Sequence, residues 1–421
     1  MILKQNVPST IGLGKWIRVE VELVTEMGLP LEPCLAKSCN FVLDCAVLEK
    51  DRMGSWQVNN KSRNLIVRCL TGDPWATELS RADWPGFYEH SQGGFEFKIL
   101  QNTFDDEIQN GPIYIYIRSS PKRRGLSTPH VLPLAIGPIS LKASSLPEKT
   151  NVHPEPGVGQ SQQIHRVLGY PVGQQLKYFL VKERWGCGTP GKLWDAALVL
   201  ASMFAKACSQ HPDCFNGTRI VDMSAGTGFI GLFIAHLLKV HQAKQIPDIT
   251  LTDIAEALRL IEENHDLNTN GSCQQLAKIE TLAWGEKSHA ERVKRSQHID
   301  IVIASDLLYN VCDFASIIST LIDLSTPGRT VIYLGYKRRG FKGKDEAEFF
   351  RLCKPYFHIS LANGPQKHLV DWEKRAGCLS IDWHTGSHSY APETVHILSG
   401  LLREQGIRIY RLVRRMDGQI L

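Results

Sequence analysis

The stretch RIVDMSAGTGFIGLFIAHLLKV, residues 219–240, decides the fold class of this chain. Its apolar start predicts a buried strand, its glycines predict a tight turn, and the remainder from Phe229 onward predicts an apolar helix. Glycine permits positive φ and lets a ligand approach the backbone closely. The start of a helix adds unpaired N–H groups and a partial positive charge. We therefore expect a strand–turn–helix unit with a ligand site at the turn.

Strand and helix signals alternate on both sides of this turn. A helical pattern covers residues 193–207, ITLTD at residues 249–253 predicts a second strand, and residues 255–268 predict a further helix. Three more apolar segments are typical of buried strands: KIETLAW, DIVIASD and TVIYLGY. This alternation predicts an α/β fold, in which helices cover both faces of a parallel sheet and ligands bind at the carboxyl ends of the strands.

Two carboxylates distinguish the ligands that this turn could bind. Gly226-x-Gly228-x-x-Gly231 satisfies the dinucleotide pattern, so a nicotinamide-dependent oxidoreductase is one hypothesis, and a turn without a ligand is another. Asp222 favours a different ligand, because a carboxylate just before the glycines suits an ammonium group. Asp253 ends the second strand, where a carboxylate can accept hydrogen bonds from a ribose diol or cap the next helix.

The N-terminal third has a different pattern. WIRVEVELV at residues 16–24 alternates apolar and polar residues, and later segments up to residue 142 repeat this character between Gly, Pro and Asn turn signals. We expect residues 1–142 to form a β-rich domain, sandwich or barrel-like. Residues 143–164 are rich in Ser, Pro, Gly and Gln and predict a linker. The α/β domain is then expected to span residues 165–421.

Composition limits the partners and the compartment. The chain has 421 residues and a net charge of only +5, which does not suit a dedicated nucleic-acid-binding protein. The longest apolar run, residues 229–240, is too short to span a bilayer, so no membrane partner is expected. Residues 1–12 lack the apolar core of a signal peptide. The 11 cysteines form no C-x-x-C pair, so we expect reduced thiols and a cytoplasmic location, with a nuclear one left open.

Five segments carry a resemblance to one family. They are VDMSAGTG (221–228), LTD (251–253), LAWGE (282–286), DIVIASDLLYN (300–310) and GKLWDAA (191–197). Together they resemble the class I, seven-strand S-adenosylmethionine-dependent methyltransferases, and most closely the lysine protein methyltransferases with an Asp-x-x-Tyr motif. Residues 407–415 are similar to that family's last, antiparallel strand. The resemblance implies a Rossmann-like, seven-strand domain with S-adenosylmethionine as the cofactor.

The resemblance also implies roles for individual residues. The turn around the methionine end of the cofactor would be formed by Asp222, Ala225, Gly226 and Gly228. Asp253 would hold the ribose, Trp284 would pack beside the adenine, and Trp194 would wall the pocket. Asp306 and Tyr309 would lie at the methyl-transfer site, where Asp306 orients the acceptor amine and adjoins the cofactor.

The implied reaction is methylation of a lysine ε-amine in a protein, and substrates of this branch include elongation factors and chaperones. The β-rich domain is then expected to help dock the protein substrate, whereas a small amine is the alternative acceptor. Ser224 departs from the family pattern, which has glycine there; at positive φ a serine costs about 1 kcal/mol. A non-catalytic protein that kept the fold is therefore a further hypothesis. The sequence does not predict the oligomeric state.

Two further clusters have open interpretations. Cys208, His211 and Cys214 have a spacing that suits zinc, but no fourth ligand is evident, so no metal is expected. Residues 337–339, Lys-Arg-Arg, could meet an acidic substrate surface or form an ordinary exposed loop. Residues 362–400 have no assigned element.

Overall fold

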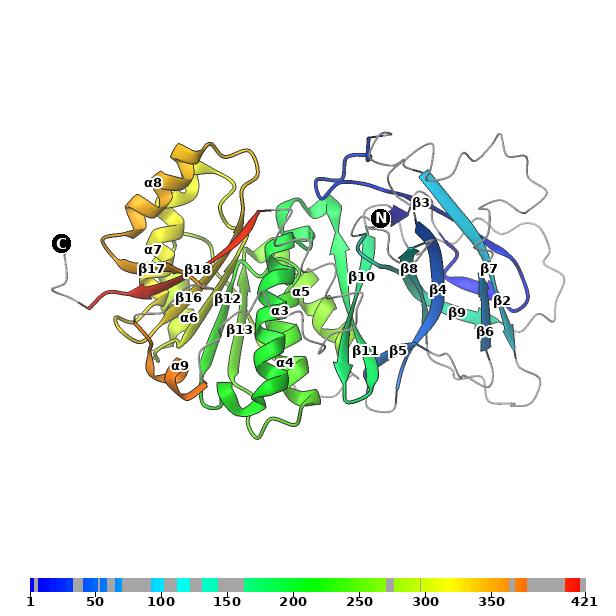
Figure 1. Cartoon of the computed structure of the whole chain (residues 1–421), viewed down its shortest axis with the longest axis horizontal. Coiled ribbons are helices and arrows are strands. Elements are labelled where there is room, and N and C mark those ends of the chain that lie inside the picture. Colours follow the sequence, from blue (N-terminus) through cyan, green and yellow to red (C-terminus); the bar gives the residue numbers. More distant parts are fainter. Residues whose placement is uncertain are drawn as a thin grey trace. The chain divides into compact units, whose positions relative to one another are not determined.

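The computed structural model divides the chain into two compact units, Met1–Gly186 and Cys187–Leu421 (Figure 1). The residues that it describes are 1–3, 7–32, 41–51, 54–58, 65–69, 92–101, 112–121, 131–142, 163–269, 276–295, 297–362, 368–376 and 406–416.

The first unit is built from two sheets. The smaller has the order β1 (Ile2–Leu3), β3 (Ile17–Glu22), β7 (Gln92–Gln101), β6 (Leu65–Cys69). The larger has the order β10 (Gln163–Val172), β11 (Gln175–Arg184), β5 (Trp56–Val58), β4 (Phe41–Lys50), β8 (Ile113–Pro121), β9 (Leu134–Lys142), β2 (Thr10–Gly12). Because β10 also pairs with β9, the larger sheet closes on itself in the manner of a barrel. The expected β-rich N-terminal region is confirmed.

The hairpin of β10 and β11 belongs to this first unit. Its strands pair with β9 and β5, and its Arg166 forms a buried ion pair with Glu183 at 2.8 Å while donating to the carbonyl of Met1. The units therefore divide after Gly186, whereas we expected the second domain to begin at residue 165. Barrel closure joins strands that are distant in sequence, so periodicity alone does not reveal it. Of the expected linker, residues 143–162 lie outside the described residues.

The thiols differ in part from expectation. Cys45 in β4 is disulfide-bonded, which corrects the prediction that the cysteines are reduced. Free thiols are found at Cys187, Cys208, Cys214, Cys312 and Cys353.

The second unit contains a seven-strand sheet. Its order is β14 (Lys278–Thr281), β13 (Asp248–Asp253), β12 (Arg219–Met223), β15 (Ile301–Ser305), β16 (Val331–Lys337), β18 (Ile407–Arg414), β17 (Phe357–Leu361). Neighbours from β14 to β16 are parallel, and β18 is antiparallel to both β16 and β17. The predicted α/β sheet with an antiparallel last strand is confirmed.

Helices cover both faces of this sheet (Figure 1). On one face α3 (Asp195–Gln210) packs on β16 and β18, α4 (Phe229–Val240) on β12 and β13, and α5 (Ala255–Asn268) on β13 and β14. On the other face lie α6 (Lys287–Lys294), α7 (Phe314–Leu324) and α8 (Gly343–Cys353), which share one apolar core with β15 and β16. Burial on both faces explains why the strands read as continuous apolar runs. None of the helices described here is both long and apolar enough to cross a membrane.

Short elements complete the described chain. Single 3-10 turns are η2 (Trp185–Cys187), η3 (Thr189–Gly191), η4 (Pro212–Phe215) and η5 (Val311–Asp313). Within residues 362–400, which had no assigned element, α9 (Asp371–Ala376) brings Trp372 into the core, 2% exposed and against the rings of Phe215 and Tyr333.

Candidate functional site

The turn after β12 is held in a left-handed conformation by several residues. Ser224, Gly226 and Gly228 have φ of +57°, +56° and +74°, in the region that favours glycine. A Cβ on Gly228 would lie 2.7 Å from the side chain of Ile261, and a Cβ on Gly226 would lie 3.2 Å from the carbonyl oxygen of Pro190. Both positions therefore need glycine. Ser224 is the residue that adopts this conformation at a cost.

Asp253 holds this turn in place. Its Oδ2 accepts a hydrogen bond from the N–H of Gly226 at 2.7 Å, and its Oδ1 accepts from the N–H of Ile254 at 2.8 Å. The alternative that Asp253 caps α5 is wrong, because the N-cap residue is Ile254. A carboxylate has about four acceptor positions, so each oxygen can still accept from a ligand hydroxyl. Burial raises the pKa of Asp253.

Asp222 is a buried carboxylate directly beneath the turn. Only 1% of the residue is exposed, and its Oδ2 accepts from the N–H of Gly231 at 3.1 Å. Burial, aided by the nearby charge of Asp253, raises the pKa of Asp222 to about 7. Within the described parts of the chain, no cation is paired with it. Burying an unpaired carboxylate is costly, so a ligand cation at this turn would offset a real penalty.

An aromatic pair lies beside the turn. Trp284 follows β14, and its indole N–H donates to the hydroxyl of Ser224 at 2.8 Å. The ring of Tyr309 lies 5.9 Å from that of Trp284, and Tyr309 is 49% exposed. Burial raises the pKa of Tyr309, and the charges of Asp313 and Asp253 add to this shift. A planar ligand group could pack on this pair.

Asp306 follows β15 and is buried by its partners. Its φ of +54° is again left-handed, and its Oδ2 accepts from the N–H of Ala196 at 2.9 Å. Its Oδ1 accepts from the guanidinium of Arg339. Burial raises the pKa of Asp306, and Arg339 opposes this shift. Asp306 therefore ties the first turn of α3 to the segment that follows β16.

Arg339 links Asp306 to Trp194, a role that the sequence did not predict, because Arg339 appeared there only as part of the basic cluster 337–339. Its guanidinium lies 5.0 Å from the centre of the Trp194 ring and 3.7 Å from the carboxylate of Asp195, which also pairs with Lys337 at 2.7 Å. Lys337 and Arg339 are thus held by carboxylates of the domain itself, which corrects both interpretations of residues 337–339 for these two side chains. The usable signal was a basic pair directly after a buried strand.

These contacts form two adjoining groups at the carboxyl ends of the strands. One group surrounds the turn: Asp222, Ser224, Gly226, Gly228, Asp253, Trp284 and Tyr309. The other joins Trp194, Asp195, Asp306, Lys337 and Arg339. Ala225 contributes its backbone, which donates to the carbonyl of Thr252 at 2.8 Å.

Two asparagines of α5 and the Cys208–His211–Cys214 cluster also need to be placed. The side chain of Asn264 donates to the carbonyl of Thr227, and that of Asn268 donates to the carbonyl of Asn264, so both brace α5. Among the described residues, no group of three or more His, Cys, Asp or Glu side chains could hold a metal ion, and Cys208 and His211 form none with their neighbours.

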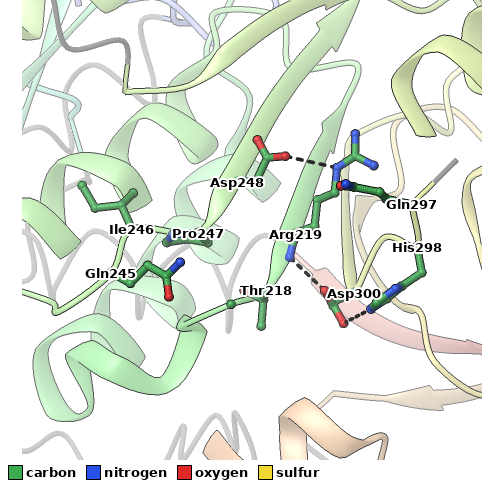
Figure 2. A pocket seen from close by; sticks show the side chains of 10 residues that line it. Thr218, Arg219, Gln245, Ile246, Pro247, Asp248, Gln297, His298 and Asp300 are labelled. Carbon is green, nitrogen blue, oxygen red and sulfur yellow. Dashed lines mark hydrogen bonds and ion pairs between the residues drawn. The ribbon is translucent and has the colours of Figure 1, made fainter. Parts of the chain in front are cut away.

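A cavity of about 450 Å³ lies at the amino ends of the strands, where β12 and β13 begin, opposite to the carboxyl ends that carry the glycine turn (Figure 2). Figure 2 shows that its polar side chains contact one another: Arg219 pairs with Asp248, and Asp300 lies 3.3 Å from the imidazole of His298. The guanidinium of Arg219 also donates to the last carbonyls of α6. We do not assign the cofactor to this cavity, because sheets of this kind bind ligands at the carboxyl ends of their strands.

Comparison with known proteins agrees with this geometry. A sequence profile of the lysine methyltransferase family matches residues 174–355. EEF1A lysine methyltransferase 3 of Mus musculus is 33% identical over 175 residues, which cover 42% of this chain and 67% of the mouse protein. Its Xenopus tropicalis counterpart is 31% identical over 227 residues, covering 50% of this chain and 91% of the frog protein. The protein-lysine N-methyltransferase EFM6 of Saccharomyces cerevisiae is 28% identical over 186 residues, covering 41% and 72%.

These similarities replace the oxidoreductase hypothesis that the glycine pattern had left open. The chain belongs to the lysine methyltransferase family and is an S-adenosylmethionine-dependent methyltransferase.

Proposed function

We propose that this enzyme methylates a lysine ε-amine in a protein, and that a translation elongation factor of the EEF1A type is the first substrate to test. The names of the mouse and frog relatives support this choice. The observation that carries the proposal is the partly buried Asp306–Arg339 pair, which lies near the half-exposed Tyr309 at the carboxyl ends of the strands, where the glycine turn also lies.

The residues around the turn fit S-adenosylmethionine. This cofactor supplies an electrophilic methyl group on a positively charged sulfur. Asp222 would bind the ammonium group of the cofactor, and this cation would offset the cost of burying the Asp222 carboxylate. Gly226 and Gly228 leave room for it beside the backbone, and Asp253 retains acceptor positions for the ribose diol. Trp284 offers an aromatic face for the adenine.

The acceptor side must hold a neutral amine in line with the methyl group. At pH 7 deprotonating an ordinary lysine costs about 4.6 kcal/mol, and an unpaired carboxylate nearby would increase that cost. Asp195 and Asp306 are matched by Lys337 and Arg339, so this cluster has no formal net charge. We propose that it can orient the amine N–H groups through Asp306 without holding the amine as ammonium.

Tyr309 completes the acceptor side of the proposal. Its ring lies 5.9 Å from that of Trp284, the residue is 49% exposed, and its hydroxyl can donate a hydrogen bond to the amine or accept one from it. The proton that the amine loses passes to water, so no general base is required of this chain.

The first unit is proposed to help dock the protein substrate. The relatives match at most 50% of this chain, and the family profile begins only at residue 174. Most of the β-rich unit is therefore an addition to the matched region. A small amine acceptor would have no evident need for it.

Acceptor labelling tests this proposal. The enzyme and labelled S-adenosylmethionine are incubated with an EEF1A-type factor. In a parallel reaction the factor is replaced by the small-molecule fraction that dialysis separates from a cell lysate. We expect label in the protein and at a lysine by mass spectrometry. Asp306→Asn should keep binding of S-adenosylhomocysteine yet reduce transfer by about 100-fold, because misplaced reactants lose roughly that much. Label in small molecules alone, or near-normal turnover by Asp306→Asn, would overturn it.

A further inference from the structure

We propose that Ser224 is a positioning residue that fixes the indole of Trp284 as a wall of the cofactor pocket. This rests on the proposed cofactor site, and it assigns a function to the one residue of the turn that departs from the glycine pattern.

The contact is specific in its geometry. The indole N–H of Trp284 donates to Oγ of Ser224 at 2.8 Å, across 60 positions of sequence. Glycine at this position would have no side chain to accept that hydrogen bond. Trp284 follows β14 and Ser224 follows β12, so the bond spans the end of β13 between them. The bond therefore orients the ring against the backbone of the turn.

The backbone conformation makes this arrangement costly. Ser224 has φ +57°, a left-handed value that glycine adopts without strain and serine does not. Strain of this kind concentrates where a function depends on it. Glycine would avoid this strain but has no hydroxyl. The hydroxyl of Ser224 makes the directed contact with Trp284.

The orientation of Trp284 affects both sides of the site. Its ring lies 5.9 Å from that of Tyr309 at an interplanar angle of 50°, so rotation of the indole would disturb the proposed acceptor side as well. Without the bond the ring can turn about its side-chain torsions, and part of the binding free energy must then order it.

Ligand-free stability and ligand affinity separate this role from a structural one. Ser224→Gly and Ser224→Ala both lose the hydrogen bond and only glycine releases the strain, so the melting temperature of the ligand-free Ser224→Gly protein should exceed that of Ser224→Ala by about 2–4 °C. The dissociation constant for S-adenosylhomocysteine, measured by calorimetry, should nevertheless rise by about 2- to 12-fold, the range for one neutral hydrogen bond. Ser224→Ala should weaken binding equally without raising the melting temperature.

Two further variants sharpen the test. Gln242 also has φ +57° but is exposed at the end of α4, so Gln242→Gly should raise the melting temperature and leave affinity unchanged. Trp284→Phe keeps an aromatic ring and removes the N–H. Combining it with Ser224→Ala should weaken binding no more than either change alone, because both remove the same bond.

The outcomes are distinct. Additive losses in the double variant, or unchanged affinity in Ser224→Gly, would overturn the positioning role. Asp253→Ala serves as the reference for the site itself. If it abolishes binding while the Ser224 variants bind normally, only this inference fails; if Asp253→Ala also binds normally, the proposed cofactor site fails with it.

Discussion

Replacing Asp222 by asparagine should stabilise the ligand-free protein while weakening its affinity for cofactor. The carboxylate is 1% exposed, and burial raises its pKa from 3.8 to about 7. Asparagine has nearly the same shape and can still accept from the N–H of Gly231. It removes a buried charge that is paired with no cation among the residues that the structure describes.

The magnitude follows from the pKa shift. A rise of about three units corresponds to roughly 4 kcal/mol at 1.36 kcal/mol per unit. The buried amide group of asparagine then loses about 1–3 kcal/mol if its own N–H groups find no acceptor. We therefore expect Asp222→Asn to increase the free energy of unfolding by about 1–3 kcal/mol at pH 8.

The gain should depend on pH with a definite sign. Because the folded pKa of Asp222 lies above the unfolded value, its favourable contribution is complete below about pH 3.8 and is lost as the pH rises through about 7. The variant lacks this titration. Its advantage should therefore be largest at pH 8, shrink as the pH falls through about 7, and turn into a loss of about 1–3 kcal/mol near pH 4, where only the cost of the buried amide group remains.

Urea unfolding at several pH values, with calorimetry of S-adenosylhomocysteine binding, measures both effects. Loss of a charge-assisted hydrogen bond should raise the dissociation constant about 10- to 100-fold. Asp213→Asn is a suitable control, since the Asp213 side chain is 41% exposed and its pKa is lowered mainly by the N–H of Lys244; it should give no gain at pH 8. An offset between Asp222→Asn and wild type that stays constant from pH 5 to 8 would refute the reasoning.

Two other changes test the packing of the site. Gly228→Ala should destabilise the protein by about 1–3 kcal/mol in thermal unfolding, because the new Cβ would lie 2.7 Å from Ile261 and the backbone is left-handed. Gly217→Ala is the control: its φ of +69° is similar, but a Cβ there would have no atom within 4 Å, so only the cost of the left-handed backbone should be lost from the stability. Arg339→Met should lower the free energy of unfolding by about 2–3 kcal/mol at pH 8, because it leaves the Asp306 carboxylate without its partner. The loss should be smaller near pH 4, where Asp306 can be protonated. Arg339→Lys keeps the charge and should recover part of the loss; equal losses for both variants would contradict the ion-pair argument.

The order of the central elements was accessible from the sequence because it depends on local signals. A buried strand, glycines of positive φ and an apolar helix follow one another within residues 219–240, and the structure has β12, the turn and α4 there. Asp222, next to the end of β12, and Asp253, the last residue of β13, were identified in the same way. Their partners were harder to predict, since Asp253 accepts from the turn as well as facing the proposed ligand.

Contacts between distant segments account for what the sequence did not reveal. The hairpin of β10 and β11 alternates like any strand pair, and only its pairing with β9 and β5 assigns it to the first unit. Arg339 appeared as one of three basic residues in a row. Its role depends on Asp306, 33 positions away, which shows that members of a charge run can belong to a partly buried network rather than to a solvated face.

The ends of the two central strands show why local rules fail at this particular edge. β12 is followed by Ser224 and β15 by Asp306, and both residues are left-handed although neither is glycine. If only the backbone conformation mattered, glycine would be the least strained residue at both positions. Each residue instead contributes a side-chain oxygen that reaches another element, Ser224 to Trp284 and Asp306 to α3 and Arg339. The strained backbone at these two neighbouring strand ends is therefore explained by the contacts of the side chains, which glycine could not make. The same two strand ends form the proposed site.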